Sequence, residues 1–185
     1  MVETQINILI KKLISIVKDT QMKEEEYKYL ASFMGNKNVL IFGTGHDTEL
    51  WRVANKNGRT VFLEHDEKWI PKDSNDVFKV EYTTDISQAS VLLEEYKAKN
   101  YSSLKMTIPS ELKKIKWDVI FVDSPPGWKE GTHGRMQSIY TAKSLATKNT
   151  DIFIHDCDRT VEDVYSTTMF RTLIKQLTKL RHMRK

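Results

Sequence analysis

The chain has 185 residues, of which 39% are hydrophobic and 29% are charged, as in one globular domain rather than a disordered segment. No apolar run approaches the ~20 residues that a membrane-spanning helix needs. Residues 1–10 lack the basic leader of a signal peptide, and the single cysteine, Cys157, excludes an internal disulfide and fits a reducing compartment. We therefore expect a cytoplasmic protein without a membrane span.

The net charge of +4 and the isoelectric point of about 9.0 favour an acidic partner, such as an anionic glycan, an anionic surface or nucleic acid. A lysine-rich solvated surface explains the same balance of charge. Basic residues cluster near the end of the chain, at Arg171, Lys175, Lys179, Arg181, Arg184 and Lys185. Composition alone does not decide between these explanations.

Hydrophobic periodicity predicts two helices first and then an alternation of strands and helices. The two helices cover residues 2–19 and Lys23–Met34, and Gly35 ends the second one. Short apolar runs, typical of strands buried on both faces, follow at 39–42, 61–63, 119–122 and 152–154, and residues 77–82 alternate loosely as a further strand. Helical stretches separate them at 48–56, 86–99 and 135–147, and 100–116 is an irregular connection.

This alternation indicates βαβ units, and therefore an α/β fold with a mostly parallel sheet and helices on both faces. We expect a single domain over residues 1–185, with N-terminal helices over 1–35 and a Rossmann-like core over 36–185. The segment 172–185 is ambiguous. Its leucines Leu173, Leu177 and Leu180 suit a helix, whereas residues 180–183 suit a strand equally well.

Ligands of an open parallel sheet bind beyond the carboxyl ends of the strands, where four apolar runs of this chain end in polar residues. The first run is followed by a glycine motif that consists of Gly43, Thr44, Gly45, His46 and Asp47. Its glycines permit a tight turn and a close approach of the backbone to a ligand. Because many such turns contain glycine, the motif alone is a weak signal.

Glu64 ends the second strand, about 20 residues after the first glycine, where a carboxylate accepts hydrogen bonds from ribose hydroxyls. A surface acid that caps the next turn is the alternative. NAD would prefer a third glycine where this chain has His46-Asp47-Thr48, and an acid there would repel a pyrophosphate. S-adenosylmethionine carries cationic groups and no phosphate, so we predict it as the cofactor. The predicted cofactor-binding residues are the glycine motif, Glu64, Asp85 and Asp123.

Two further strand ends carry candidate groups. Asp123 follows the run 119–122, and two prolines stiffen the loop behind it. This loop contains Trp128, which would either stack on a sugar ring or an adenine or belong to the core. His155 and Asp156 follow the run 152–154. A lone histidine is more often structural, but here two acids and an arginine follow within four residues, which favours a functional role.

Five motifs, in the same order, resemble the plant glucuronoxylan 4-O-methyltransferases and the related arabinogalactan glucuronate methyltransferases. They lie at Phe42–Asp47, Phe62–Trp69, Trp117–Asp123, Gly134–Tyr140 and His155–Glu162, and the resemblance covers roughly residues 20–185. It implies a Rossmann-like methyltransferase fold, S-adenosylmethionine as the methyl donor and O4 of a glucuronic acid in a glycan as the acceptor. It also implies two final strands, at Thr172–Leu177 and Leu180–Arg184. The resemblance also implies a Golgi membrane anchor in the plant proteins, whereas we expect none in this chain, so the natural glycan stays open.

A sugar hydroxyl is a poor nucleophile at neutral pH, so methyl transfer to it needs a base or a metal. Asp123, His155 and Asp156 are the candidate catalytic residues. Asp123 and Asp156 end neighbouring strands, as metal-binding residues do in catechol-type O-methyltransferases. Together with an imidazole, two carboxylates suit Mg, Mn or Co, so a divalent cation is a further candidate cofactor.

An acidic glycan substrate needs cationic side chains near the site. Arg135, Arg159 and His133 are candidates for holding a uronate carboxylate, the arginines through a two-pronged pair, and Trp128 completes the candidate substrate site. Surface ion pairs are the alternative explanation for each arginine.

Two other functions are compatible with the sequence. The basic end of the chain favours an RNA or small-molecule methyltransferase on the same fold, although the aromatic-basic interleaving of RNA-stacking surfaces is missing. A binding or scaffold protein without catalysis is the third candidate, and the acids and His155 argue against it. The oligomeric state does not follow from the sequence.

Overall fold

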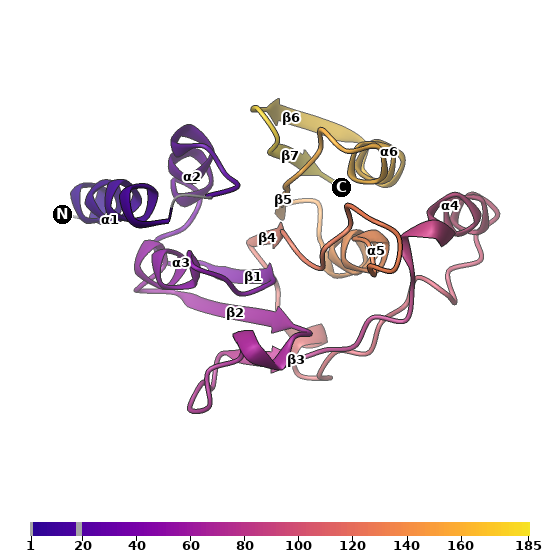
Figure 1. Ribbon diagram of the computed structural model, residues 1–185, viewed down its shortest axis with the longest axis horizontal. Coiled ribbons are helices and arrows are strands. Elements are labelled where there is room, and N and C mark those ends of the chain that lie inside the picture. Colours follow the sequence, from indigo (N-terminus) through magenta and orange to yellow (C-terminus); the bar gives the residue numbers. More distant parts are fainter. Residues whose placement is uncertain (1, 18–19) are drawn as a thin grey trace.

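The computed structural model describes residues 2–17 and 20–185 (Figure 1). Within these ranges, seven strands form one sheet in the order β3-β2-β1-β4-β5-β7-β6. The parallel strands are β1 (Asn38–Phe42), β2 (Arg59–Glu64), β3 (Val77–Lys79), β4 (Val119–Val122) and β5 (Asp151–Ile154). An antiparallel hairpin of β6 (Thr172–Gln176) and β7 (Arg181–Arg184) joins the sheet beside β5. The predicted α/β fold and the two final strands are thereby confirmed.

Helices cover both faces of this sheet, so the molecule has three layers (Figure 1). One face carries α1 (Val2–Ile16), α2 (Glu24–Ala31) and α3 (Thr48–Ala54). The other face carries α4 (Ala89–Lys97), α5 (Met136–Leu145) and α6 (Thr160–Met169). Short 3₁₀ helices occupy Glu67–Trp69, Ile86–Gln88 and Leu112–Lys114.

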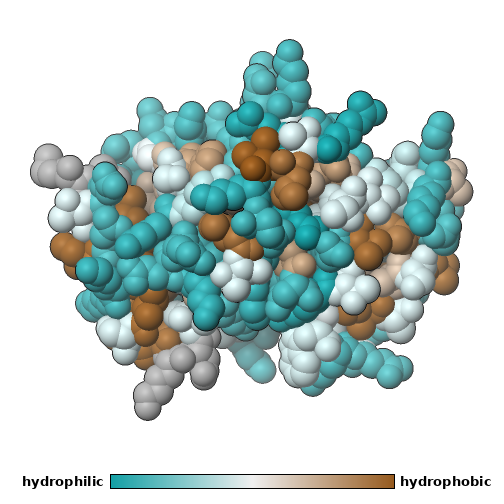
Figure 2. Space-filling model, turned by 90° about the horizontal axis from the view of Figure 1, so that it is seen from above, coloured by the Kyte–Doolittle hydropathy of each residue, from teal (hydrophilic) through white to brown (hydrophobic). Residues whose placement is uncertain are grey.

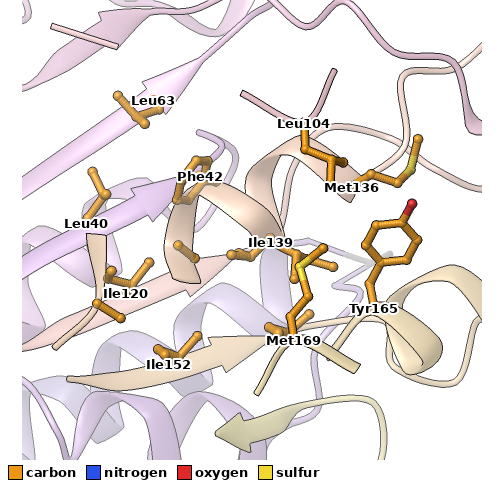
Figure 3. Packing of buried hydrophobic residues seen from close by; sticks show 14 of the residues in the cluster. Leu40, Phe42, Leu63, Leu104, Ile120, Met136, Ile139, Ile152, Tyr165 and Met169 are labelled. Carbon is orange, nitrogen blue, oxygen red and sulfur yellow. The ribbon is translucent and has the colours of Figure 1, made fainter. Parts of the chain in front are cut away.

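The central strands are apolar throughout because both of their faces are buried. Leu40 of β1 packs in the cluster that α4, α5 and α6 cover, whereas its neighbour Val39 packs in the cluster under α1, α2 and α3. Figure 3 shows the first cluster, in which Ile139 of α5 and Met169 of α6 lie over the strands. Each fully buried aliphatic side chain contributes roughly 1.5–3 kcal/mol, so the uninterrupted apolar runs favour a sheet with two covered faces.

All five predicted helices are present with shorter ends, but α6 is not predicted by the sequence pattern. Its segment is rich in threonine and valine, which have low helix propensity. Two signals for it exist: the acids Glu162 and Asp163 in the first turn and the helical spacing of Val161, Tyr165 and Met169.

The other differences from the predicted elements are small. Of the predicted run 77–82, only Val77–Lys79 forms a strand, and the connection 100–116 is irregular apart from the single turn at Leu112–Lys114. Residues 18–19 of the first predicted helix lie outside the described residues.

The N-terminal helices share their apolar cluster with the sheet. Ile6 and Ile10 of α1 are buried in it, and α1 packs against both α2 and α3. Within residues 2–17 and 20–185, no helix has the length and apolarity that a membrane span requires. The face in Figure 2 is mostly hydrophilic, with its hydrophobic residues in small separate patches.

The buried side chain of Glu26 ties α2 to the C-terminal hairpin. Its Oε1 accepts hydrogen bonds from the backbone nitrogens of Lys179 (2.7 Å) and Leu180 (2.9 Å), and Oε2 accepts one from Lys23 (2.7 Å). Burial opposes the charge of this carboxylate, but contact with His155 and these three amides lowers the pKa of Glu26 to about 2. The charged carboxylate therefore holds two distant chain segments at the edge of the site.

Candidate active site

The carboxyl ends of four central strands lie in one row. Phe42 of β1 pairs with Leu63 of β2 and with Val122 of β4, which in turn pairs with Ile154 of β5. The residues that come next along these strands are Gly43, Glu64, Asp123 and His155. They stand side by side at one edge of the sheet, as the strand-end pattern predicts.

A cavity of about 350 Å³ opens at this edge. The predicted site residues that line it are Gly43, Thr44, Gly45, His46, Asp47, Glu64, Asp123, Trp128, Arg135 and Arg159. His155 and Asp156 are fully buried and do not reach it, and among the described residues His133 and Asp85 also stand outside its lining. The cavity thus brings together the predicted cofactor residues, except Asp85, with only one of the three candidate catalytic residues.

Part of the cavity wall comes from residues that the sequence pattern does not reveal. Leu13 and Val17 line it, together with the segment 20–22 that follows α1. Nothing in the helical pattern of residues 2–19 points to a ligand, so this wall emerges only from the packing of α1. Trp69, in the turn after β2, also lines the cavity, and its only sequence signal is its place in the second motif.

Two tryptophans at the cavity remain substantially exposed. The side chain of Trp128 is 63% exposed and that of Trp69 is 43% exposed. The structure therefore excludes the core position that the sequence left open for Trp128. Exposed indole rings that border a cavity offer flat apolar faces to a sugar or a base.

Gly43 is the position at which the glycine motif needs glycine. Its φ is +108°, and a Cβ atom there would lie 2.7 Å from the Cβ of Ser124. A side chain would therefore meet both backbone strain and the loop after β4.

Asp47 closes the glycine motif at the start of α3. Its Oδ2 accepts a hydrogen bond from the indole nitrogen of Trp51 (3.0 Å). Burial and the nearby charge of Asp123 raise the pKa of Asp47 to about 6.

Glu64 is buried at the base of the cavity rather than exposed on the surface. Oε2 accepts hydrogen bonds from the backbone nitrogen (2.8 Å) and the hydroxyl (2.9 Å) of Thr44. Oε1 accepts from the backbone nitrogens of His65 (2.7 Å) and Asp66 (2.8 Å). Burial opposes its charge, but the contacts with His65, Asp66 and Thr44 lower the pKa of Glu64 to about 2. The carboxylate is thus a fixed anion in the wall of the cavity.

Beneath the cavity lies a buried charge cluster, made of Asp123, Arg135, His155, Asp156 and Glu162. Arg135 Nη2 lies 2.7 Å from Asp156 Oδ2 and 3.2 Å from Asp123 Oδ1, and Nε lies 3.9 Å from Glu162 Oε1. Asp156 adopts a φ of 60°, a left-handed conformation that costs roughly 1–2 kcal/mol in a residue other than glycine. Local strain of this kind is typical of functional sites.

Arg135 has a different role from the one expected. It is 3% exposed, and its Nε, Nη1 and Nη2 donate to the carbonyl oxygens of Pro125 (3.2 Å), His155 (2.9 Å) and Asp123 (2.9 Å). Because each guanidinium nitrogen already has a protein acceptor, the side chain is not free to bind a substrate carboxylate. Arg135 instead holds the loops after β4 and β5 together.

His155 also differs from the expectation of a general base. Its Nδ1 lies 3.1 Å from Asp123 Oδ1, and the ring is fully buried. Burial disfavours the charged imidazole, but Asp123, Glu26 and Asp156 raise the pKa of His155 to about 9. The ring is therefore charged at neutral pH and out of reach of a substrate, so we revise its role to that of positioning Asp123.

Asp85 and His133 make contacts that differ from the predicted ones. Asp85 Oδ1 accepts hydrogen bonds from the backbone nitrogen (2.9 Å) and the hydroxyl (2.7 Å) of Ser87 and so caps the Ile86–Gln88 turn. His133 Nδ1 lies 3.0 Å from the carbonyl oxygen of Thr84. These local contacts support a structural role for both residues rather than cofactor or substrate binding.

Solved structures with this fold include a putative caffeoyl-CoA O-methyltransferase from Staphylococcus aureus. It superposes with a TM-score of 0.53 and 11% identity, over 97% of this chain and 92% of that one. A Thermoplasma acidophilum protein superposes with a TM-score of 0.50 and 11% identity, over 100% of this chain and 98% of that one. At such identity the likeness establishes the fold alone, which is the Rossmann-like fold of class I methyltransferases.

The chain belongs to the IRX15/IRX15L/GXM family, whose sequence model matches residues 27–183. Arabidopsis thaliana glucuronoxylan 4-O-methyltransferase 1 is 36% identical over 168 residues, which cover 78% of this chain and 60% of the relative. Glucuronoxylan 4-O-methyltransferase 2 is 38% identical over 154 residues (70% and 52%), and arabinogalactan O-methyltransferase 1 is 34% identical over 153 residues (70% and 53%), both from the same plant. The chain thus spans between about half and three-fifths of these relatives. The family resemblance of the five motifs is confirmed.

Replacing Arg135 with methionine tests the buried charge cluster, because it removes the cation and keeps much of the side-chain volume. We expect the free energy of unfolding to fall by about 3–5 kcal/mol, since buried carboxylates lose their counter-ion. Chemical denaturation measures this loss. Arg59→Met, at an exposed arginine of β2, is the matched control and should change stability by less than about 0.5 kcal/mol. Equal losses in the two variants would contradict the role of Arg135.

Proposed function

We propose that this chain transfers a methyl group from S-adenosylmethionine to a sugar hydroxyl, O4 of a glucuronic acid residue in a glycan. The observation that carries the proposal is the single cavity in which the glycine motif, Glu64 and Asp123 meet at the carboxyl edge of the sheet. The names of the relatives, which are glucuronoxylan 4-O-methyltransferases and arabinogalactan O-methyltransferases, support the choice of acceptor.

Donor binding would rest on Glu64 and the glycine motif. Three of the hydrogen bonds to Glu64 come from backbone nitrogens and fix the carboxylate, whereas the fourth comes from the hydroxyl of Thr44. That hydroxyl can rotate away and leave an oxygen lone pair for a ribose hydroxyl. Gly43 lets the backbone approach the bound nucleoside closely.

The charge of the cavity also suits this donor. Its carboxylates belong to Asp47, Glu64, Asp66 and Asp123. S-adenosylmethionine carries a sulfonium and an ammonium group, which such carboxylates attract, and it lacks the phosphates that they would repel. The same four carboxylates argue against a dinucleotide in this cavity.

Asp123 is the residue best placed to accept the proton of the acceptor hydroxyl. Its side chain is 25% exposed and lines the cavity, while His155 and Arg135 hold it from below. The acceptor oxygen attacks the methyl carbon, the carbon–sulfur bond breaks, and the hydroxyl proton passes to Asp123. Burial opposes its charge, but His155 and Arg135 hold the pKa of Asp123 below its ordinary value. A weak base suffices here, because the oxygen becomes strongly acidic as the new bond forms.

We also propose that a divalent cation assists the methyl transfer. Asp123, His155 and Asp156 offer two carboxylates and an imidazole whose ligand atoms lie within 4.8 Å of one another, a donor set that suits Mg, Mn or Co. Among the described residues, the oxygens of Asp156 make ion pairs, with Oδ2 close to Arg135 and Arg159, but they accept no well-aligned hydrogen bond, and Nε2 of His155 makes none either. Because Arg135 Nη2 contacts both carboxylates, binding would require it to release one of them. Binding would also require His155, whose pKa is raised to about 9, to give up its proton, since only the neutral imidazole is a metal ligand. A bound cation would lower the pKa of the acceptor hydroxyl.

Glu64→Ala tests the donor site. We expect the dissociation constant for S-adenosylmethionine to rise about tenfold or more, since the ribose hydrogen bond to the charged carboxylate, worth about 1.5–3 kcal/mol, is lost. Titration calorimetry measures the constant, and Glu49→Ala, at an exposed acid of α3, should leave it unchanged. If both variants bind the donor as the wild type does, Glu64 is not part of the donor site.

Removal of divalent ions tests the cation. Exhaustive EDTA treatment should lower methyl transfer by about tenfold or more, and added Mn or Co should restore it. Donor affinity, measured on the same samples, should not change. A chain that keeps full activity after EDTA has no catalytic cation, and Arg135 then supplies the positive charge between the two carboxylates.

A further inference from the structure

A second hollow adjoins the cavity of the candidate active site, which we call the donor cavity because the proposed function places S-adenosylmethionine there. Residues 20–22 and Arg159 line both, so the two share a wall. The residues that line only the second one are Ile14, Lys23 and Lys179. We call this second part the basic hollow, because three of its lining residues (Lys23, Arg159 and Lys179) are cations.

The two parts differ in charge. Four carboxylates line the donor cavity, whereas none of the described residues that line the basic hollow carries one. A cationic donor and an anionic acceptor would therefore be drawn to neighbouring but different places. This separation keeps a negative acceptor away from the carboxylates around the donor.

The backbones that carry the cations of the basic hollow are held in place. Glu26 accepts hydrogen bonds from the backbone nitrogens of Lys23 and Lys179, both at 2.7 Å, and so fixes the two lysines relative to each other. Arg159 is held by Asp156, whose Oδ2 lies 3.0 Å from Nη1, and its side chain is 28% exposed. Glu26 and Asp156, which hold these cations, also surround His155, the residue that positions Asp123.

We propose that the basic hollow binds the carboxylate of the acceptor sugar, and that Arg159, Lys179 and Lys23 are the residues that recognise it. This inference rests on the proposed function. Arg159 borders both parts, so a carboxylate beside it would set the neighbouring ring hydroxyl towards the donor cavity. This role replaces the one expected for Arg135, whose nitrogen atoms are all engaged.

The charge balance favours a single carboxylate over a nucleic acid. Arg159 is paired with Asp156, and Lys179 lies 3.4 Å from Asp158 Oδ2. Among the described residues Lys23 forms no ion pair, so the described lining contributes about one uncompensated positive charge. A polyphosphate backbone requires an extended track of unpaired cations, whereas one uronate requires one charge and one hydrogen-bonding fork.

The test measures binding of a glucuronate-substituted xylo-oligosaccharide to the chain saturated with S-adenosylhomocysteine. Lys179→Gln and Arg159→Gln should each weaken this binding roughly tenfold, and the double variant roughly a hundredfold, as for the loss of charge-assisted hydrogen bonds. Lys148→Gln, at an exposed lysine away from both cavities, is the control and should bind as the wild type does. Unsubstituted xylo-oligosaccharide should bind equally to all of these proteins.

Affinity for S-adenosylhomocysteine separates the possible failures. Lys179 lines only the basic hollow, so Lys179→Gln should keep the wild-type affinity for this molecule and thereby report a folded site. If the wild type binds S-adenosylhomocysteine but the variants keep full affinity for the uronate ligand, the carboxylate site is wrong and the donor site stands. If the wild type does not bind S-adenosylhomocysteine, the proposed function is refuted, and the carboxylate site with it.

Discussion

The guanidinium of Arg135 lies where the ends of β4 and β5 and the starts of α5 and α6 converge. It donates to backbone carbonyls of both strand-end loops and faces three carboxylates, including Glu162 of α6. Leaving any of these buried charges unpaired costs several kcal/mol, so the four elements are not independent of one another. The position of Asp123 at the cavity follows from this arrangement, because His155 and Arg135 hold it from below.

A second buried charge, Glu26, also holds distant segments of the chain together, on the other side of His155. It fixes the start of α2 and the turn of the C-terminal hairpin, and its Oε2 lies 3.8 Å from His155 Nε2. The N-terminal segment and the last strands, which are far apart in sequence, thereby become neighbours at the basic hollow. The acidic donor cavity and the basic hollow thus share one framework of buried ion pairs.

The sheet and its ligand-binding edge were predictable because they depend on local pattern: buried parallel strands read as apolar runs, and their ends align in space. That placed Gly43, Glu64 and Asp123 correctly at one edge. The partners of Arg135 were not predictable, since an arginine after a loop has the same sequence signature whether it faces solvent or a buried cluster. Helix α6 was not predicted because threonine and valine have low helix propensity. The cavity wall at residues 20–22 was not predictable either, because it depends on how α1 packs.

The most direct measurement of the central claim is the fate of a labelled methyl group. S-adenosylmethionine with a labelled methyl is offered with a glucuronate-substituted xylo-oligosaccharide, with its carboxyl-reduced counterpart, and with total RNA, and mass spectrometry locates the label. The proposed function predicts label on O4 of the glucuronate residue and little or none on the reduced sugar or on RNA. Equal labelling of the two sugars would contradict recognition of the carboxylate, and label on RNA alone would contradict the proposed acceptor.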